Sequence, residues 1–185
     1  KAINVLKTWK PNVIGIAQYS WNSELNLFVC RLIKQSYPEC LIVAGGPNLD
    51  GKDPEKIKFF KDNNFVDICV GYDGEIPFAQ IIRLLLSGKN SESIRKAKVA
   101  GTYSFDRINN AILFSQNKAP RLDSLDVFGP VYANGQFDEF LDDGFHPFLQ
   151  THRGCPFTCA FCHTSDPYYS RMLFLPPEIF RQDME

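Results

Sequence analysis

The fold is decided by residues 40–48, CLIVAGGPN, in which a short apolar run is followed at once by glycines, a proline and an asparagine. An uninterrupted apolar run that ends in glycine is typical of a strand buried on both faces of a parallel sheet. Similar runs lie on either side of it, at residues 13–17 and 66–70. The sequence therefore predicts three buried parallel strands.

Helical periodicity fills the intervals between these strands. A first helix is expected before Pro38, where apolar residues recur at helical spacing: Leu25, Phe28, Val29, Leu32 and Ile33. Further helices are expected at residues 53–63, after an Asp-Pro start, and at residues 75–88, with Gly88 just past the end. The alternation predicts an α/β fold, a Rossmann-like parallel sheet with helices on both faces.

Glycine and polar residues collect where the three strands end. Ligands of open α/β sheets bind beyond the carboxyl ends of the strands, so we expect a site there. Glycines at two of these strand ends would let a ligand come close to the backbone, which favours a large flat ligand. The same glycines are also what tight turns need, and the sequence leaves both explanations open. The candidate binding residues, called the rim below, are Ser20, Gly45, Gly46, Gly71, Gly74 and Glu75.

The rhythm breaks after Gly88. Residues 99–116 predict a hairpin, and residues 117–145 lack a regular period, which is typical of a linker. Residues 147–152 predict one more strand, and the chain ends inside a helix that follows Pro176 and Pro177.

We accordingly divide the chain into three parts. The first is the Rossmann-like domain at residues 1–90, the second a hairpin and linker at 91–146, and the third the beginning of another domain at 147–185. Since the only methionines are Met172 and Met184, Lys1 is not a translation start, and we expect an excised or processed piece.

Charge and hydropathy exclude two classes of partner. The net charge is -1, with 20 Lys and Arg residues interspersed among 21 Asp and Glu residues. No basic face is expected, so we expect no nucleic acid partner. The apolar runs fall far short of the ~18 residues that span a bilayer, so we expect no membrane span.

The six cysteines form two groups. Cys30, Cys40 and Cys69 are scattered among apolar neighbours, which predicts buried free thiols in a reducing compartment, here the cytoplasm. The others fall within eight residues and are separated by three and then two residues: Cys155, Cys159 and Cys162. Three soft thiolates on one loop predict a metal site.

The identity of the metal stays open at this point. Structural zinc needs four ligands, which His152 or His163 could complete. The run from Cys159 to His163 also fits the CxxCH attachment pattern of a c-type haem. An iron-sulfur cluster held by three thiolates would instead leave one iron open to a substrate.

The cysteine loop, RGCPFTCAFC at residues 153–162, resembles that of the radical S-adenosylmethionine (SAM) enzymes. Residues 10–16, 44–47 and 70–78 resemble the cobalamin-binding domain carried by one large class of these enzymes. The resemblance covers nearly the whole chain. It implies a Rossmann-like domain of the cobalamin-binding type, incomplete at its N-terminus, followed by a linker hairpin and the start of a radical SAM partial (βα) barrel.

The resemblance also implies cofactors and roles. Cys155, Cys159 and Cys162 would bind three irons of a four-iron four-sulfur (4Fe-4S) cluster, SAM would bind the fourth, and Phe161 would pack beside its adenine. One electron from a reducing donor would cleave SAM to a 5′-deoxyadenosyl radical. Cobalamin would lie against the rim, and a methyl group would pass to an unactivated carbon of a small-molecule or peptide substrate.

Two departures from the family leave alternatives. The Asp-x-His-x-x-Gly motif, which supplies an axial histidine to cobalamin in many proteins, is absent. The glycine-rich motifs of later barrel strands are also missing, so we expect this piece alone to be inactive. The alternatives are a radical SAM enzyme with a vestigial Rossmann module that binds no cobalamin, and a non-enzymatic zinc or c-type haem protein.

Overall fold

The computed structural model describes residues 8–49, 53–114, 118–142 and 144–185. The chain divides into two compact units, Lys1–Arg121 and Leu122–Glu185. Among the helices in these described ranges, none is long and apolar enough to cross a membrane.

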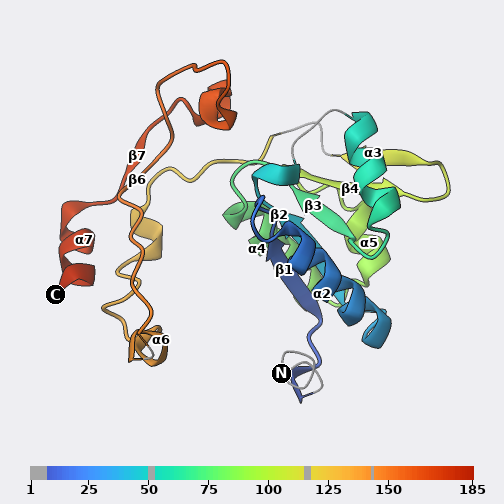
Figure 1. Cartoon of the computed structure of the whole chain (residues 1–185), viewed down its shortest axis with the longest axis horizontal. Helices are drawn as coiled ribbons and strands as arrows, with labels where there is room; N and C mark the ends of the chain where they lie inside the picture. Colours follow the sequence, from blue (N-terminus) through green and yellow to red (C-terminus); the bar gives the residue numbers. More distant parts are fainter. Residues whose placement is uncertain (1–7, 50–52, 115–117, 143) are drawn as a thin grey trace. The chain divides into compact units, whose positions relative to one another are not determined.

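The first unit is built on a five-stranded sheet with the order β1-β2-β3-β4-β5 (Figure 1). Strands β1 (Val13–Ala17), β2 (Leu41–Gly45) and β3 (Ile68–Val70) run parallel, with Ala17 opposite Gly45 and Gly45 opposite Val70. Strands β4 (Thr102–Asp106) and β5 (Ala111–Phe114) continue the sheet in antiparallel pairing. The three predicted parallel strands are therefore confirmed, and the α/β sheet is compatible with a Rossmann-like fold.

The helices cover both faces of this sheet. They are α2 (Ser23–Ser36), α3 (Asp53–Asp62), α4 (Glu75–Leu86) and α5 (Ser91–Lys96). Gly88 follows α4 with a φ of +83°, as expected of a residue just past a helix end. The short α5 was not expected from the sequence, because it is mostly polar and its start depends on Asn90, whose side chain accepts a hydrogen bond from the Ser93 amide.

The core follows the alternation of side chains along β2. Ile42 and Ala44 pack on one side with Cys30 of α2 and Phe60 of α3. Leu41 and Val43 face the other side, where α4 contributes Ile81 and α5 contributes Ile94. Because β2 is covered on both faces, it needs an apolar residue at every position, which is why its sequence is uninterrupted.

The hairpin differs from the expectation that it belongs with the linker. Tyr103 of β4 lies opposite Cys69 of β3, so the hairpin completes the sheet of the first unit. The physical reason is that β3 would otherwise expose the backbone groups of its outer edge. Strand periodicity predicted the hairpin but not its partner.

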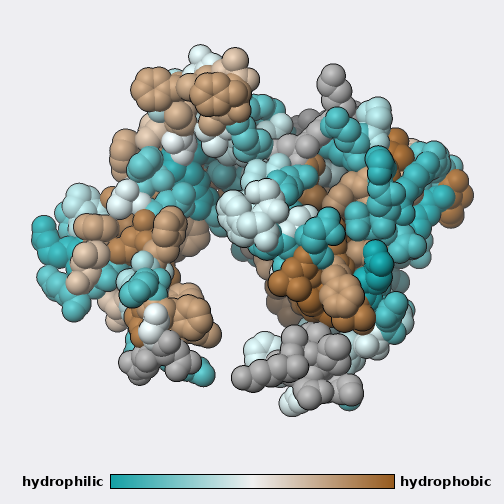
Figure 2. Space-filling view, viewed as in Figure 1, coloured by the Kyte–Doolittle hydropathy of each residue, from teal (hydrophilic) through white to brown (hydrophobic). Residues whose placement is uncertain are grey.

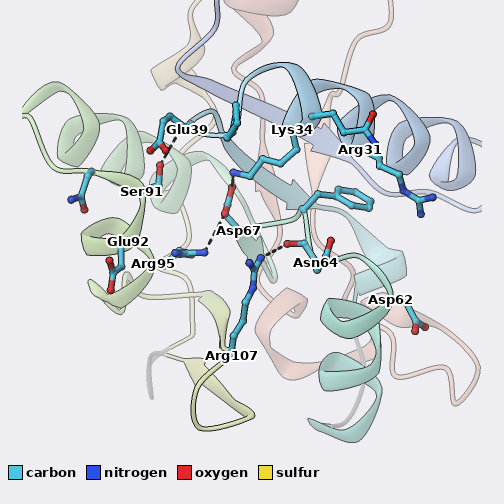
Figure 3. A pocket seen from close by; sticks show the side chains of 14 residues that line it. Arg31, Lys34, Glu39, Asp62, Asn64, Asp67, Ser91, Glu92, Arg95 and Arg107 are labelled. Carbon is cyan, nitrogen blue, oxygen red and sulfur yellow. Dashed lines mark hydrogen bonds and ion pairs between the residues drawn. The ribbon is translucent and has the colours of Figure 1, made fainter.

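A buried carboxylate ties the amino ends of the strands together. The Asp67 side chain is 2% exposed and accepts hydrogen bonds from Lys34 Nζ at 2.7 Å, the Ile42 amide at 2.8 Å and Arg95 Nη1 at 3.4 Å. These donors come from α2, β2 and α5, and Figure 3 shows Lys34 and Arg95 both pointing at Asp67.

The second unit contains α6 (Asp138–Asp142), β6 (His152–Arg153), β7 (Leu173–Phe174) and α7 (Pro177–Met184). The helix expected after Pro176 is confirmed. The strand expected at residues 147–152 is wrong for all but its last residue: β6 is two residues long and pairs antiparallel with β7. The Tyr132 hydroxyl hydrogen-bonds both the amide and the carbonyl of Phe148, which removes these groups from any ladder. The start of a barrel is therefore not seen in the described part of this unit.

Asp183 of α7 fastens a preceding segment of the same unit. Its carboxylate accepts hydrogen bonds from the amides of Val131 at 3.0 Å, Tyr132 at 2.7 Å and Ala133 at 3.0 Å. Desolvation raises the pKa of the Asp183 carboxyl, but the three amide donors outweigh it, and the net pKa lies below the ordinary value.

Removal of the Asp67 carboxylate is expected to destabilise the first unit. In Asp67→Ala the Ile42 amide, Lys34 and Arg95 lose their acceptor. The free energy of unfolding should fall by about 3 kcal/mol, which is less than the loss expected for a fully buried ion pair, because Lys34 and Arg95 reach water. Urea denaturation measures this. Asp62→Ala is the control, since Asp62 forms an exposed pair with Lys58 and should cost under about 0.5 kcal/mol. Equal losses in the two variants would contradict the role of Asp67.

The Asp183 contact is expected to be lost in acid. A carboxyl whose folded pKa is lowered contributes its stability above the ordinary pKa of 3.8 and loses it as the pH falls through the folded pKa. The amide proton shifts of residues 131–133, followed by NMR, should therefore titrate together with a midpoint below pH 3.8. Asp183→Asn should abolish this titration, whereas Glu178→Ala on the same helix should leave it unchanged. A midpoint at or above 3.8 would mean that the three amides do not favour the charged carboxylate.

Candidate functional site

The rim lies at the carboxyl ends of β1, β2 and β3, where the chain leaves each strand. The Gln18 amide donates to the Gly45 carbonyl at 2.6 Å, and the Asn48 amide donates to the Gln18 carbonyl at 3.3 Å. A turn of 3₁₀ helix at Pro47–Leu49 follows β2 directly. The first two strand ends are thus bonded to each other beyond the last paired residues, and they form one continuous edge.

Gly46 is required by this close approach. A Cβ on Gly46 would lie 2.7 Å from the Gln18 carbonyl oxygen and 2.9 Å from its amide nitrogen, and the φ of Gly46 is +108°. No side chain fits there whether or not a ligand binds. Of the two explanations that the sequence left open, the turn geometry accounts for Gly46.

Gly45 is different, because a side chain would fit. A Cβ there would meet only Val70 atoms, at 3.8 Å and beyond, which is ordinary van der Waals contact. Packing therefore does not explain this glycine. A ligand that approaches the strand end closely would.

The remaining rim residues differ in access. Ser20 is exposed, Gly74 and Glu75 are half-buried at the start of α4, and Gly71 is buried. The Gly71 amide donates to the Gly101 carbonyl at 2.9 Å. Gly71 therefore shapes the loop after β3 and offers little surface to a ligand.

A buried amide lies directly beneath the rim. The Gln18 side chain is fully buried, and its Oε1 accepts a hydrogen bond from Ser23 Oγ at 2.6 Å. Its Nε2 has no hydrogen-bond partner within the described residues. An unsatisfied buried donor costs about 1–3 kcal/mol. Gln18 was not selected from the sequence, although a polar residue directly after an apolar strand was the available signal.

A flat aromatic surface at the end of β1 was also missed. The rings of Tyr19 and Trp21 stack at 4.7 Å with an interplanar angle of 11°, and Trp21 is 78% exposed. Two aromatic residues on either side of Ser20 were the signal. A large exposed ring next to open backbone suits a flat ligand, as the glycines alone had suggested.

The cysteine loop lies in the second unit and begins at a fixed point. Gly154 has a φ of +109°, and a Cβ there would lie 2.8 Å from the Tyr169 carbonyl oxygen and would clash with the Arg171 carbonyl. The Cys155 amide donates to the Tyr169 carbonyl at 2.9 Å. Gly154 is therefore needed for the loop to start against residues 169–171.

The thiols of this loop are accessible. Cys159 is exposed, and Cys155 and Cys162 are half-buried. Cys162 Sγ lies 3.1 Å from Thr164 Oγ1, and the hydrogen bonds from Thr164, first from its hydroxyl and then from its amide, lower the pKa of the Cys162 thiol. A lowered pKa favours the thiolate, which is the form that binds metal.

The three scattered cysteines are buried, and the pKa values of their thiols are raised. Cys30, Cys40 and Cys69 are free and buried, as expected. Burial, with a smaller contribution from Cys40, raises the pKa of the Cys30 thiol to about 11. Burial also raises the pKa of Cys40 and, more strongly, that of Cys69. These thiols stay protonated at neutral pH and are unsuited to bind metal.

The donor set of the loop fits a metal, but its side chains are not gathered. Within the described ranges, no three His, Cys, Asp or Glu side chains lie together as a metal site. His163, the fourth ligand considered for zinc, lies against the Tyr169 ring at 5.7 Å. What fits a metal is the chemistry of three accessible thiols on one loop, and the metal site at Cys155, Cys159 and Cys162 stays a prediction.

Aromatic side chains stand beside these thiols. Phe161 is 93% exposed and Phe157 is 69% exposed. Figure 2 shows apolar side chains at the top of the view, over the loop that joins β6 to β7. Phe161 is thus free to pack against a planar group, which is the role that the resemblance implied for it.

A wide polar groove lies at the other end of the sheet. It measures about 720 Å³ and is lined by Arg31, Lys34, Asp67, Arg95 and Arg107, among others (Figure 3). Its inner charges bond to the protein itself: Lys34 and Arg95 to Asp67, and Arg107 to the Asn64 carbonyl. We therefore interpret it as a structural ion network.

No protein-family model matches the chain. Curated relatives do. The chain is 30% identical, over 95% of its length, to the cobalamin-dependent radical SAM methyltransferase TokK of Streptomyces tokunonensis. It is 26% identical, over 95% of its length, to the 2-(S-pantetheinyl)-carbapenam-3-carboxylate methyltransferase of Streptantibioticus cattleyicolor. An uncharacterized methyltransferase of Pyrococcus horikoshii is 24% identical over 87% of the chain.

The chain spans only part of these relatives. It covers 25% of each of the first two enzymes and 33% of the Pyrococcus protein. The similarity nonetheless includes both units of this chain, since it extends over nearly all 185 residues.

Proposed function

We propose that the chain, a relative of the cobalamin-dependent radical SAM methyltransferases, forms part of an enzyme that uses SAM, a 4Fe-4S cluster and cobalamin to methylate an unactivated carbon. The substrate class is a small molecule or a peptide. A reducing electron donor is required, because the cleavage of SAM consumes one electron.

The observation that carries this proposal is the cysteine loop. Its three thiols are accessible, and Thr164 lowers the pKa of Cys162. We assign Cys155, Cys159 and Cys162 as the ligands of three irons. Three ligands suffice only if a fourth coordination position is left for another molecule, which separates a catalytic cluster from a closed structural zinc site.

The groups to be bound supply the reactive chemistry: the cluster an electron for SAM, and cobalamin a methyl group for transfer. The residues of this chain bind and orient. Gly154 fixes the start of the loop, which sets where Cys155 lies. The exposed Phe161 offers a ring against which the adenine of SAM can stack.

The rim is assigned to the flat corrin ring. Gly45 leaves open backbone, Ser20 is exposed beside it, and Trp21 adds an exposed ring. All three histidines, His146, His152 and His163, lie in the second unit. Within residues 1–121 no imidazole is therefore available as an axial ligand, and the proposal for this unit rests on ring contacts.

Each loop cysteine should be needed for the cluster. After anaerobic reconstitution with iron and sulfide, the 185-residue chain is expected to show the broad thiolate-to-iron absorption near ~400 nm. Cys155→Ala, Cys159→Ala and Cys162→Ala should each lose this band and the bound iron. Cys30→Ala and Cys69→Ala are matched controls that should keep both, because these buried thiols remain protonated. One equivalent of zinc without the band would overturn the radical SAM assignment.

The corrin should be sensitive to a side chain at Gly45. Gly45→Val places a branched side chain on the open backbone, and we expect its affinity for hydroxocobalamin to fall about 100-fold, or ~2.7 kcal/mol. An absorbance titration measures this. Ala111→Val is the control, since it also introduces a valine, but at the opposite end of the sheet, where Ala111 pairs with Asp106.

Two other outcomes of that titration are informative. Equal affinity of the two variants would place the corrin elsewhere. Failure of the unaltered chain to bind hydroxocobalamin would instead favour a Rossmann module without cobalamin, while the cluster experiment would still decide the radical SAM assignment.

A further inference from the structure

A short segment at the end of the first unit lies against the rim. This segment, Lys118–Arg121, is called the strap below, and it directly precedes Leu122, where the second unit begins. It touches the loop after β3, which contains Gly71, Tyr72, Asp73 and Gly74. Two direct contacts join the strap to this loop, a third reaches the loop through Gly101, and none of them was predicted from the sequence.

The first contact is a steric one through Gly101. Ala119 is 3% exposed, and a Cβ on Gly101 would lie 2.6 Å from the Ala119 Cα. The φ of Gly101 is +78°, so both the backbone conformation and the proximity of Ala119 exclude a side chain there. Since the Gly101 carbonyl also accepts from the Gly71 amide at 2.9 Å, Gly101 links the strap to the first residue of the loop.

The second contact is a nearly buried ion pair. Arg121 Nε lies 3.1 Å from Asp73 Oδ2, and the two side chains are 8% and 11% exposed. Charges so far removed from water interact much more strongly than an exposed pair and tolerate little displacement. The pair joins residues that are 48 positions apart in the chain.

The third contact lies over Tyr72. Lys118 Nζ is 4.9 Å from the centre of the Tyr72 ring, within the range of a cation-π interaction. Tyr72 has a φ of +65°, which residues other than glycine rarely adopt because the Cβ is crowded. A strained residue persists only where its surroundings hold it; here Lys118 of the strap lies over the ring, and the Gly101 carbonyl bonds to the preceding residue, Gly71.

We propose that Arg121 is a positioning residue of the rim, which holds the loop after β3 in its binding shape through Asp73. The corrin part of this proposal rests on the proposed function; the clamp itself does not. If the ordered loop is the form that binds ligand, ligand at the rim must in turn stabilise the strap, because coupling between two equilibria is reciprocal. Ligand binding at the rim and the ordering of the strap would then each favour the other.

The clamp is tested without ligand by hydrogen exchange followed by mass spectrometry. In the 185-residue chain, Arg121→Gln should speed exchange of the amides at residues 71–74, 118, 119 and 121 about tenfold or more. Asp73→Asn should do the same, and the double variant should accelerate exchange less than the two single effects combined, since both single variants remove the Arg121–Asp73 pair. Arg121→Lys, which keeps the charge, should recover most of the protection.

The matched control is Arg107→Gln. Arg107 also bonds to the backbone of the first unit, at the Asn64 carbonyl, but it lines the groove at the other end of the sheet. It should leave exchange at residues 71–74 unchanged. Unaltered exchange in Arg121→Gln, or equal acceleration in the two variants, would overturn the clamp.

The coupling is tested with hydroxocobalamin. Its binding should slow exchange of the strap amides in the unaltered chain, and Arg121→Gln should weaken binding about fivefold to tenfold while Arg107→Gln should not. Binding that is equally tight in Arg121→Gln and leaves the strap unprotected would overturn the coupling. No binding by the unaltered chain would overturn the corrin assignment of the rim, and the ligand-free experiment would still decide the clamp.

Discussion

The rim depends on how closely β1 and β2 approach at their carboxyl ends. The Gln18 backbone bonds to the chain on both sides of Gly46, and Gly46 can follow only because it has no side chain. This approach brings the residues that leave β1 beside the first turn after β2, and it buries the Gln18 amide beneath them.

Ion pairs stabilise both ends of the parallel strands, but only one end is suited to bind a ligand. At the amino ends, Lys34 and Arg95 already bond to the Asp67 carboxylate, so the groove around it has little to offer a ligand. At the carboxyl ends, the Gln18 Nε2 lacks a partner among the described residues, and the loop held by Arg121 contains a strained Tyr72. Unsatisfied polar groups and strain persist where a function compensates for them, and both lie on the side where α/β sheets bind ligands.

The cysteines show how environment separates residues of one type. Cys30 lies against the sheet, where desolvation raises the pKa of its thiol to about 11. Cys162 lies on a loop, where hydrogen bonds from Thr164 lower the pKa of its thiol. Spacing along the sequence divided the cysteines correctly into a scattered and a clustered group, because burial follows apolar neighbours. The lowered pKa depends on a hydroxyl two residues away, which spacing alone does not reveal.

By itself the sequence determined the parallel strands, the helices α2, α3 and α4 that cover them, the two groups of cysteines and the family resemblance, because apolar periodicity and short motifs are local signals. Tertiary structure decided what joins distant residues. The β4–β5 hairpin entered the sheet because β3 needed a partner, and Tyr132 withdrew Phe148 from the expected strand. Gly46 must be glycine because the Gln18 backbone lies against it, and Gly101 must be glycine because Ala119 does. Arg121 is held by its ion pair with Asp73. These contacts form between residues that are not neighbours in the chain, and a local sequence pattern does not show which of them meet.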